Sequence, residues 1–264
     1  MSIQLLGTLM RLLVKERMIY RGDFLLGVIA QLISYAAEYV VLWIFINKFQ
    51  SLAGWSWPEV ALLYSFGLFT YALGASISFL QMQSLEAQVQ EGTLDSLLVK
   101  PLNPYLYHIC RGFNLAYIAH LLISGSVLVW ALSVLQLSWT WWSVLYVALA
   151  VLGGAMIQAG LMSAIGAAAF VWVRTGFLFQ LFFRLKEFIS YPLPIFGSLI
   201  QIVLTFIIPF AFVNYYPAAY LLGKDSLLMP VWGMWIVPAV GPLVYWLGYV
   251  VWMRGVNKYQ GAGG

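Results

Sequence analysis

The sequence predicts an all-α integral membrane protein with six transmembrane helices. Of its 264 residues, 63% are hydrophobic and only 8% are charged, whereas about 25% of the residues of a soluble domain are charged. So few charged side chains cannot cover the surface of a soluble protein of this size. The composition therefore excludes a cytosolic enzyme, a disordered chain and a disulfide-stapled secreted domain. The single cysteine, Cys110, cannot form an internal bridge.

Six stretches of the chain are long and apolar enough to cross a bilayer, which takes roughly 20 residues per helix. The first stretch ends at Asn47 and Lys48, and the second begins after Trp57 and Pro58. The sequence contains no soluble domain and no internal repeat, so we expect residues 1–264 to form one membrane domain. In chain order the predicted spans are 24–46, 60–80, 113–135, 143–171, 196–213 and 231–253.

The basic residues predict the orientation, because cytoplasmic loops carry an excess of Lys and Arg. With six spans, both termini and the loops after the second and fourth spans lie on one side. That side carries all but two of the 13 basic residues, and only Lys48 and Lys224 lie opposite. We therefore expect cytoplasmic N- and C-termini. The tryptophans at 55–57 and 139–142 then form an outer aromatic belt.

Three further segments are predicted to lie at the membrane surface or to enter it partway. Residues 5–18 mix leucines with basic residues, which indicates an interfacial helix on the cytoplasmic face. Residues 174–195 combine an aromatic stretch with Arg184, Lys186 and two later prolines, which also favours an interfacial helix. Residues 214–223 are too apolar for an open outer loop, so we expect a short re-entrant or interfacial segment before the last span.

Polar residues inside the spans are candidate functional residues. Gln31, Tyr35 and Glu38 share one face of the first span. A carboxylate there costs about 2.5–3.5 kcal/mol on insertion scales, so it should face protein or water. Gln158 and Gln201 lie within the fourth and fifth spans. Two interpretations stay open for all five residues: they line a translocation path, or they join packed helices by hydrogen bonds.

The segment 86–101, on the predicted cytoplasmic side, is amphipathic. A break at Gly92 precedes a short helix that Thr93 caps, and three leucines form one apolar face. Its polar positions are mostly acidic, whereas a helix resting on the membrane usually has a basic polar face. The acidity favours docking to a protein partner over resting on the membrane. The candidate docking residues are Glu91, Gly92, Leu94, Asp95, Leu97, Leu98, Lys100 and Pro101.

Catalytic and cofactor motifs are missing from the sequence. A phosphate-binding loop requires Gly-Lys-Ser/Thr after a glycine-rich turn, but the only Gly-Lys pair, at Gly223, is followed by Asp225. His108, His120 and Cys110 do not form a metal-ligand pattern. We therefore expect no enzymatic activity and no cofactor in this chain. The formal charge of +4 is explained by topology and does not indicate nucleic-acid binding.

Four motifs in order carry a resemblance to a known family. They are Arg-Gly-Asp-Phe at 21–24, the segment 91–101, the aromatic stretch 209–223 and Tyr-Gln-Gly-Ala-Gly-Gly at 259–264. Together they resemble the permease subunits of ABC-2 type transporters, in a poorly characterised bacterial branch. The resemblance covers essentially the whole chain and implies a six-span half-transporter in the bacterial plasma (inner) membrane.

The resemblance also implies partners and a mechanism. A dimer of ABC ATPase subunits would bind ATP and magnesium, and residues 91–101 would be the coupling helix that contacts it. A second permease subunit would complete the transporter as a homodimer or heterodimer, with a heterodimer favoured. Most such permeases are exporters. The alternatives are a stand-alone secondary transporter or channel, or a membrane-bound lipid or glycan enzyme, and the sequence does not identify the substrate.

Overall fold

The fold is a bundle of long helices. The computed structural model describes residues 21–172 and 174–259, so the predicted interfacial helix at 5–18 lies outside the described residues. Within them, five helices are long and apolar enough to cross a membrane, and no strand occurs. The all-α membrane fold is thus confirmed. The long helices are α2 (Arg21–Phe49), α3 (Trp57–Gln90), α6 (Ile118–Val134), α7 (Trp141–Ala167) and α11 (Val237–Lys258).

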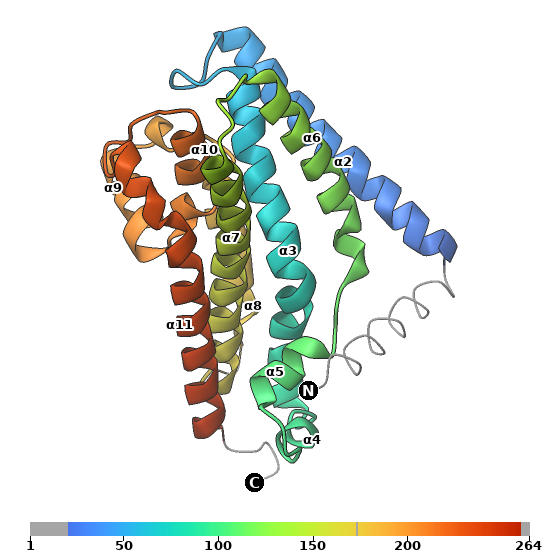
Figure 1. The fold of residues 1–264 in the computed structure, drawn as a ribbon. Coiled ribbons are helices and arrows are strands. Elements are labelled where there is room, and N and C mark those ends of the chain that lie inside the picture. Colours follow the sequence, from blue (N-terminus) through green and yellow to red (C-terminus); the bar gives the residue numbers. More distant parts are fainter. Residues whose placement is uncertain (1–20, 173, 260–264) are drawn as a thin grey trace.

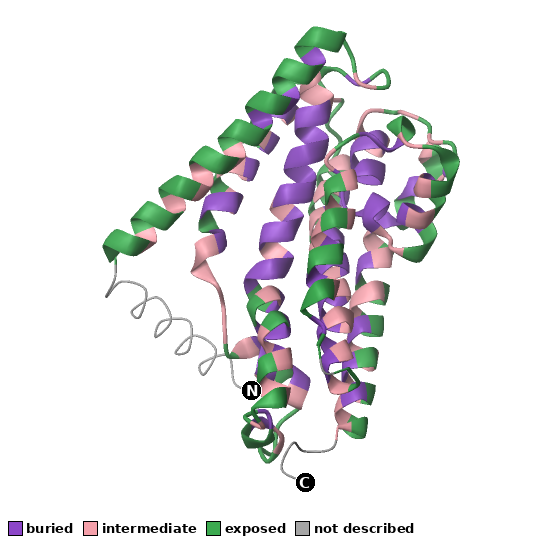
Figure 2. Cartoon of the chain, turned by 180° about the vertical axis from the view of Figure 1, so that it is seen from behind, coloured by how far each residue is buried: buried purple, intermediate pink, exposed green. Residues whose placement is uncertain are grey.

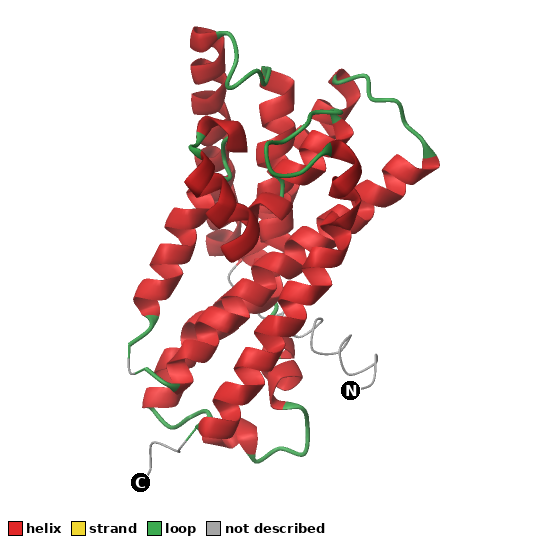
Figure 3. Cartoon of the chain, turned by 90° about the vertical axis from the view of Figure 1, so that its left-hand side faces the viewer, coloured by secondary structure: helices red, strands yellow, loops and turns green. Residues whose placement is uncertain are grey.

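The bundle has two ends, which we call upper and lower as oriented in Figure 1. Helices α2 and α6 rise to the upper end, while α3, α7 and α11 descend from it. Loops gather mainly at these two ends (Figure 3). The shorter helices are α4 (Asp95–Leu98) and α5 (Pro104–Cys110) at the lower end, followed later in the chain by α8 (Gly176–Phe188), α9 (Ser198–Ile202) and α10 (Tyr215–Leu221).

Helix α3 is the centre of the bundle and is buried over most of its length (Figure 2). It packs against both α7 and α6. Pro58 lies in its first turn, where the missing N–H costs nothing. The helix stops at Gly92, whose φ of +69° is the left-handed conformation that glycine adopts most easily. The break predicted at Gly92 is therefore confirmed.

Helices α7 and α11 form a closely packed seam with small residues facing each other. A Cβ atom on Gly160 would lie 2.6 Å from the carbonyl oxygen of Val244. Added Cβ atoms on Gly241 and Gly248 would overlap the backbone of Gly153 and Gly160, respectively. Close backbone approach through small residues is the usual way in which membrane helices associate. This seam joins α7 and α11 into one unit, to which α3 adds a third member.

Helix α8 differs from the interfacial helix expected at 174–195. Its first residues bind the Glu86 carboxylate near the lower end of α3. Near its other end, Lys186 contacts Tyr71, which lies fifteen residues, about 22 Å, higher on α3. The helix therefore runs along the bundle and does not lie across it. The reason is its aromatic face, because Phe179 and Phe182 are buried in the bundle.

The fifth predicted span, 196–213, is not one continuous helix. Helix α9 has five residues and continues as a π-helical turn, Val203–Ile207, before Pro209 ends it. Proline lacks an N–H donor, and the preceding residue, Ile208, is extended. The chain thus ascends as α8, and this helix is interrupted after Ile189. Short helical segments then form the rest of this part of the chain in the upper half of the bundle. The count of six crossings and the orientation of the termini remain predictions.

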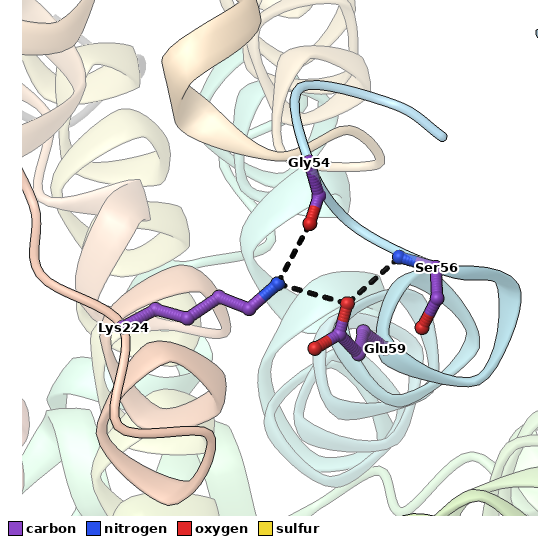
Figure 4. A network of polar contacts seen from close by, with 4 residues as sticks. All are labelled: Gly54, Ser56, Glu59 and Lys224. Atoms are coloured by element: carbon purple, nitrogen blue, oxygen red, sulfur yellow. Dashed lines mark hydrogen bonds and ion pairs between the residues drawn. The ribbon is translucent and has the colours of Figure 1, made fainter. Parts of the chain in front are cut away.

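A polar network fastens the loop after α10 to the upper end of α3 (Figure 4). The Lys224 ammonium donates to the Glu59 carboxylate at 2.8 Å and to the Gly54 carbonyl at 2.9 Å. The same carboxylate accepts the Ser56 N–H at 2.7 Å, and Lys224 also lies over the Trp55 ring. One lysine therefore holds the α2–α3 loop and the loop after α10 together.

Candidate functional site

A polar cavity of about 200 Å³ lies between α2, α3 and α8 in the upper half of the bundle. Glu38 of α2 lines it opposite Lys186 and Glu187 of α8. Charged residues at membrane depth are costly and almost always face a water-filled cavity or a bundle interior. Their convergence on one cavity makes it the candidate functional site. The polar lining includes Tyr35, Glu38, Tyr64, Lys186, Glu187 and Asn214.

Glu38 is held at the cavity wall by tyrosines. Its carboxylate accepts a hydrogen bond from the Tyr64 hydroxyl, and the Tyr39 and Tyr64 rings meet edge to face at 4.9 Å. Tyr39 also shares a 2.8 Å hydrogen bond with Ser65. In the described part of the chain, no cation lies within 4 Å of Glu38. The carboxylate therefore faces the cavity without an ion pair in direct contact, and Lys186 interacts with it electrostatically at longer range.

Lys186 lies on an aromatic surface. Its Nζ is 3.6 Å from the centroid of the Tyr71 ring, a cation–π distance. Phe183 packs edge to face on Tyr71 from the same helix face. Among the described residues, no carboxylate lies within 4 Å of this ammonium. The lysine is thus positioned by rings, and its charge stays available to a ligand.

Next to Lys186, aromatic and imidazole groups from three helices are joined by hydrogen bonds. The Tyr35 hydroxyl lies 2.6 Å from His120 Nε2, and the Tyr71 and Tyr117 hydroxyls are 3.3 Å apart. His120 also contacts the rings of Tyr71 and Tyr117. These contacts link α2, α3 and α6 through polar groups, in contrast to the glycine seam of α7 and α11.

Asn214 forms the upper wall of the cavity. Its amide donates to the Leu63 carbonyl at 3.1 Å and to the Ile189 carbonyl at 2.6 Å. Asn214 therefore attaches the chain segment after α8 to α3. Its amide lies beside Gly67, where an added Cβ would be only 3.0 Å from the Asn214 amide nitrogen. The cavity exists because α8 stops at this height.

The five predicted path-lining or packing residues occupy different environments. Tyr35 and Glu38 line the cavity. Gln158 is fully buried and donates to Thr70 at 3.0 Å, which joins α7 to α3. Gln201 donates to the Phe196 carbonyl at 2.8 Å, a local bond at the start of α9. Gln31 is absent from the cavity lining.

Sequence reasoning missed Lys186, Glu187 and Asn214 as lining residues. Assigning 174–195 to the membrane surface removed the first two from consideration. A signal was present, because Phe179, Phe182 and Lys186 share one helical face. A lysine on an otherwise aromatic face indicates a buried cation more than a surface one.

The predicted docking segment is oriented differently from the expectation. Leu94 and Leu97 are 0% and 2% exposed, so they pack within this chain and are not available to a partner. They are buried because Gly92 turns the chain back against α3, where the Leu94 N–H donates to the Gln88 carbonyl. The outward apolar residues are instead Val99, Leu102 and Leu106, at 82%, 45% and 55% exposed.

The exposed polar residues of this segment agree with the expectation. Glu91, Asp95, Lys100 and Pro101 are all exposed, while Gly92 and Leu98 are partly buried. Lys100 donates to the Tyr107 hydroxyl, and this contact lowers the pKa of Tyr107 below its ordinary value. We call residues 91–110 the lower elbow.

The lower elbow is tied to three long helices. Asn103 caps α5 and donates to the Tyr249 hydroxyl of α11 at 3.0 Å. Tyr105 and Ser163 of α7 share a 2.9 Å hydrogen bond, and His108 bonds the Gln81 carbonyl of α3 at 3.0 Å. A displacement of the lower elbow would therefore be transmitted to α3, α7 and α11 together.

These features define a multi-span membrane protein with an intramembrane charged cavity and an anchored elbow at one end, the architecture of a transport component. A comparison with family models matches residues 32–263 to the family described as ABC-2 family transporter protein. The chain belongs to that family, and it is a permease component of an ABC transporter. Membership implies association with an ABC ATPase. No curated protein and no solved structure matches the chain.

Proposed function

We propose that this chain, as one permease domain over residues 1–264, forms the translocation path of an ABC exporter in the bacterial plasma membrane. The observation that carries the proposal is the meeting of Glu38 and Lys186 at one cavity within the bundle. Such charges are expensive in a membrane and are retained where they serve a path or a ligand. The cavity between α2, α3 and α8 is the proposed path.

The lower end is proposed to be cytoplasmic. Lys100 and Arg111 flank α4 and α5 at this end, Arg174 precedes the first turn of α8, and Arg254 and Lys258 are in the last turns of α11, in agreement with the positive-inside rule. Arg184 and Lys186 lie on α8 within the bundle and do not count toward this loop charge. The lower elbow then faces the cytoplasm, where ATPase subunits reside. Lys224 closes the opposite, outer end.

The lower elbow is the proposed docking site for a dimer of ATPase subunits that bind ATP and magnesium. Val99 and Leu102 supply exposed apolar contacts, and Asp95 and Lys100 supply charged ones. Because the elbow is bonded to α3, α7 and α11, closure of the ATPase dimer would move these three helices relative to α2 and α8. A second permease subunit, preferably a different gene product, would complete the path.

Cysteine labelling tests the path. Ser190 lines the cavity, whereas Ser163 is fully buried between α7 and α5. In a Cys110→Ser background and in the complex with the ATPase, Ser190→Cys should react with a charged thiol reagent. The rate should change when a non-hydrolysable ATP analogue is added, and Ser163→Cys should stay unreactive in both states.

Three outcomes discriminate among the hypotheses. Equal protection of both cysteines would exclude this cavity as the path. Reactivity at Ser190→Cys that ignores the ATP analogue would favour the alternative of a stand-alone transporter or channel. An ATP-dependent rate supports the permease mechanism.

Substitution at the lower elbow tests docking. Val99→Asp with Leu102→Asp should abolish co-purification of the ATPase, because two carboxylates would replace exposed apolar contacts, while the permease stays folded. Glu91→Gln with Leu106→Ser is the matched control on the same segment, with smaller expected loss. Retained association in the first pair would contradict the assignment.

A further inference from the structure

The lower end of the α7–α11 seam widens into an apolar groove of about 490 Å³. Part of its wall is formed by residues with small side chains, and longer side chains at these positions would have filled the groove. Trp172 and Val251 border the groove and are half-exposed to the surroundings. The small wall residues are Ala164, Ala167, Ala168 and Gly255.

Two cations lie at the rim of this groove. Arg254 and Lys258 are both exposed, both line the groove, and are spaced four residues apart on one face of α11. In the described part of the chain, neither side chain forms an ion pair or a hydrogen bond. The groove thus combines a long apolar surface with an unneutralised pair of positive charges at one end.

We propose that this groove binds one anionic phospholipid of the lower leaflet, with an acyl chain between α7 and α11 and the phosphate at Arg254 and Lys258. Arginine binds phosphate oxygens through two parallel hydrogen bonds, and lysine adds a point charge. Basic pockets between membrane helices on the cytoplasmic side bind anionic headgroups in this way.

The charges argue for a lipid over a protein helix in this groove. Apart from the two cations, its lining residues are apolar or aromatic, so a protein partner would have to bring carboxylates to the rim and nothing polar elsewhere. An anionic phospholipid matches this groove directly, because it has apolar acyl chains and a negatively charged headgroup at one end. The site lies mainly on α7 and α11, with Leu178 of α8 at its edge, and it shares no lining residue with the cavity of α2, α3 and α8, so the inference does not depend on the proposed path.

Native mass spectrometry of the full chain in detergent tests the inference. The protein would be titrated with phosphatidylglycerol and with phosphatidylcholine of the same acyl chains. We expect phosphatidylglycerol to bind about 25-fold more tightly, about fivefold for each cation. Arg254→Gln with Lys258→Gln should reduce its affinity to that of phosphatidylcholine. Arg111→Gln, an exposed cation elsewhere at the lower end, should leave the preference unchanged.

A second pair of variants tests the acyl-chain part of the site. Ala168→Phe fills the groove and should weaken the binding of both lipids, and Ala164→Leu on the same wall serves if the first variant does not fold. Equal affinity of the wild type for the two lipids would overturn the inference, as would a preference that survives loss of both cations. A polypeptide bound in the groove in place of lipid would also overturn it.

Discussion

The two sides of α3 are built in opposite ways. On one side, α7 and α11 approach through glycines, and Gln158 and Thr70 bond in a buried position. On the other side, α2 and α8 contact α3 through tyrosines, phenylalanines, a lysine and a carboxylate around a cavity. Of the apolar stretch of α2 only 11% is buried, against 83% for α3.

This difference assigns different roles to the two sides. A glycine seam has one close-packed arrangement, because any shift makes backbone atoms collide or leaves a void. Tyrosine hydroxyls and a lysine can exchange protein partners for water or a ligand at small cost. The α3–α7–α11 side is therefore the rigid unit, which we also call the rigid side. The α2–α8 side, which can separate from it, is called the loose side. The lower elbow is bonded to the rigid unit.

The largest expected effect comes from adding one methyl group to the rigid side. Gly160→Ala should destabilise the protein by about 3 kcal/mol, the upper end of the 1–3 kcal/mol range for overpacking a tightly packed interior, because its Cβ would lie 2.6 Å from the Val244 carbonyl oxygen. Thermal unfolding in detergent measures the change.

Gly27→Ala is the matched control on the loose side. A Cβ there meets no atom within 4 Å, so only helix propensity changes, and stability should stay equal or rise slightly. Equal destabilisation by the two substitutions would remove the distinction between the sides.

The next prediction concerns the charge on the loose side. Lys186→Met should not lower stability, because it removes a charge from membrane depth. It should change the chemistry of the cavity: at Ser190→Cys, the ratio of labelling rates for an anionic and a cationic thiol reagent should fall about tenfold, since a unit charge at close range is worth more than 1 kcal/mol.

Gln158→Leu is the counterpart on the rigid side. It removes the hydrogen bond to Thr70 and should cost about 1 kcal/mol of stability without changing the labelling ratio. A ratio that is unaffected by Lys186→Met would mean that the lysine does not set the potential of the cavity.

The sequence predicted most of the rigid side and less of the loose side, for a physical reason. Long apolar stretches bounded by Trp, Pro or charge predicted α3, α7 and α11, because membrane insertion depends on composition within one segment. The break at Gly92 was predicted because φ above zero is a local requirement. Glu38 and Tyr35 were singled out because a polar face on one helix is visible without its neighbours.

The course of α8 depends on contacts between distant segments. Its lysine and its prolines are typical of a surface helix when only residues 174–195 are considered. The partners that hold it inside, Glu86 and Tyr71, lie on α3, and Asn214 comes after another break. The burial of Leu94 and Leu97 depends similarly on how the lower elbow folds back. No periodicity within one segment encodes these long-range contacts.

The last prediction concerns the contact that attaches α8 to the lower end of α3. The Glu86 carboxylate accepts the backbone N–H groups of Thr175 and Gly176, each at 2.7 Å, and the Thr175 hydroxyl at 3.0 Å. It therefore caps the N-terminus of α8 from another helix. The Thr175 N–H, followed by the other donors, holds the pKa of Glu86 below its ordinary value.

Glu86→Gln should cost about 1 kcal/mol, the usual value of a helix N-cap, because the amide is neutral and can accept fewer of these bonds. Since the folded-state pKa is lowered, the wild-type contribution is complete above the ordinary value of 4.5 and is lost as pH falls through the lower folded value. The stability difference between wild type and variant, measured by unfolding from pH 7 to pH 3, should therefore shrink only at the acid end. A difference that is constant with pH would show that Glu86 acts by packing and not by its charge, and α8 would then be attached to the rigid unit by its aromatic face alone.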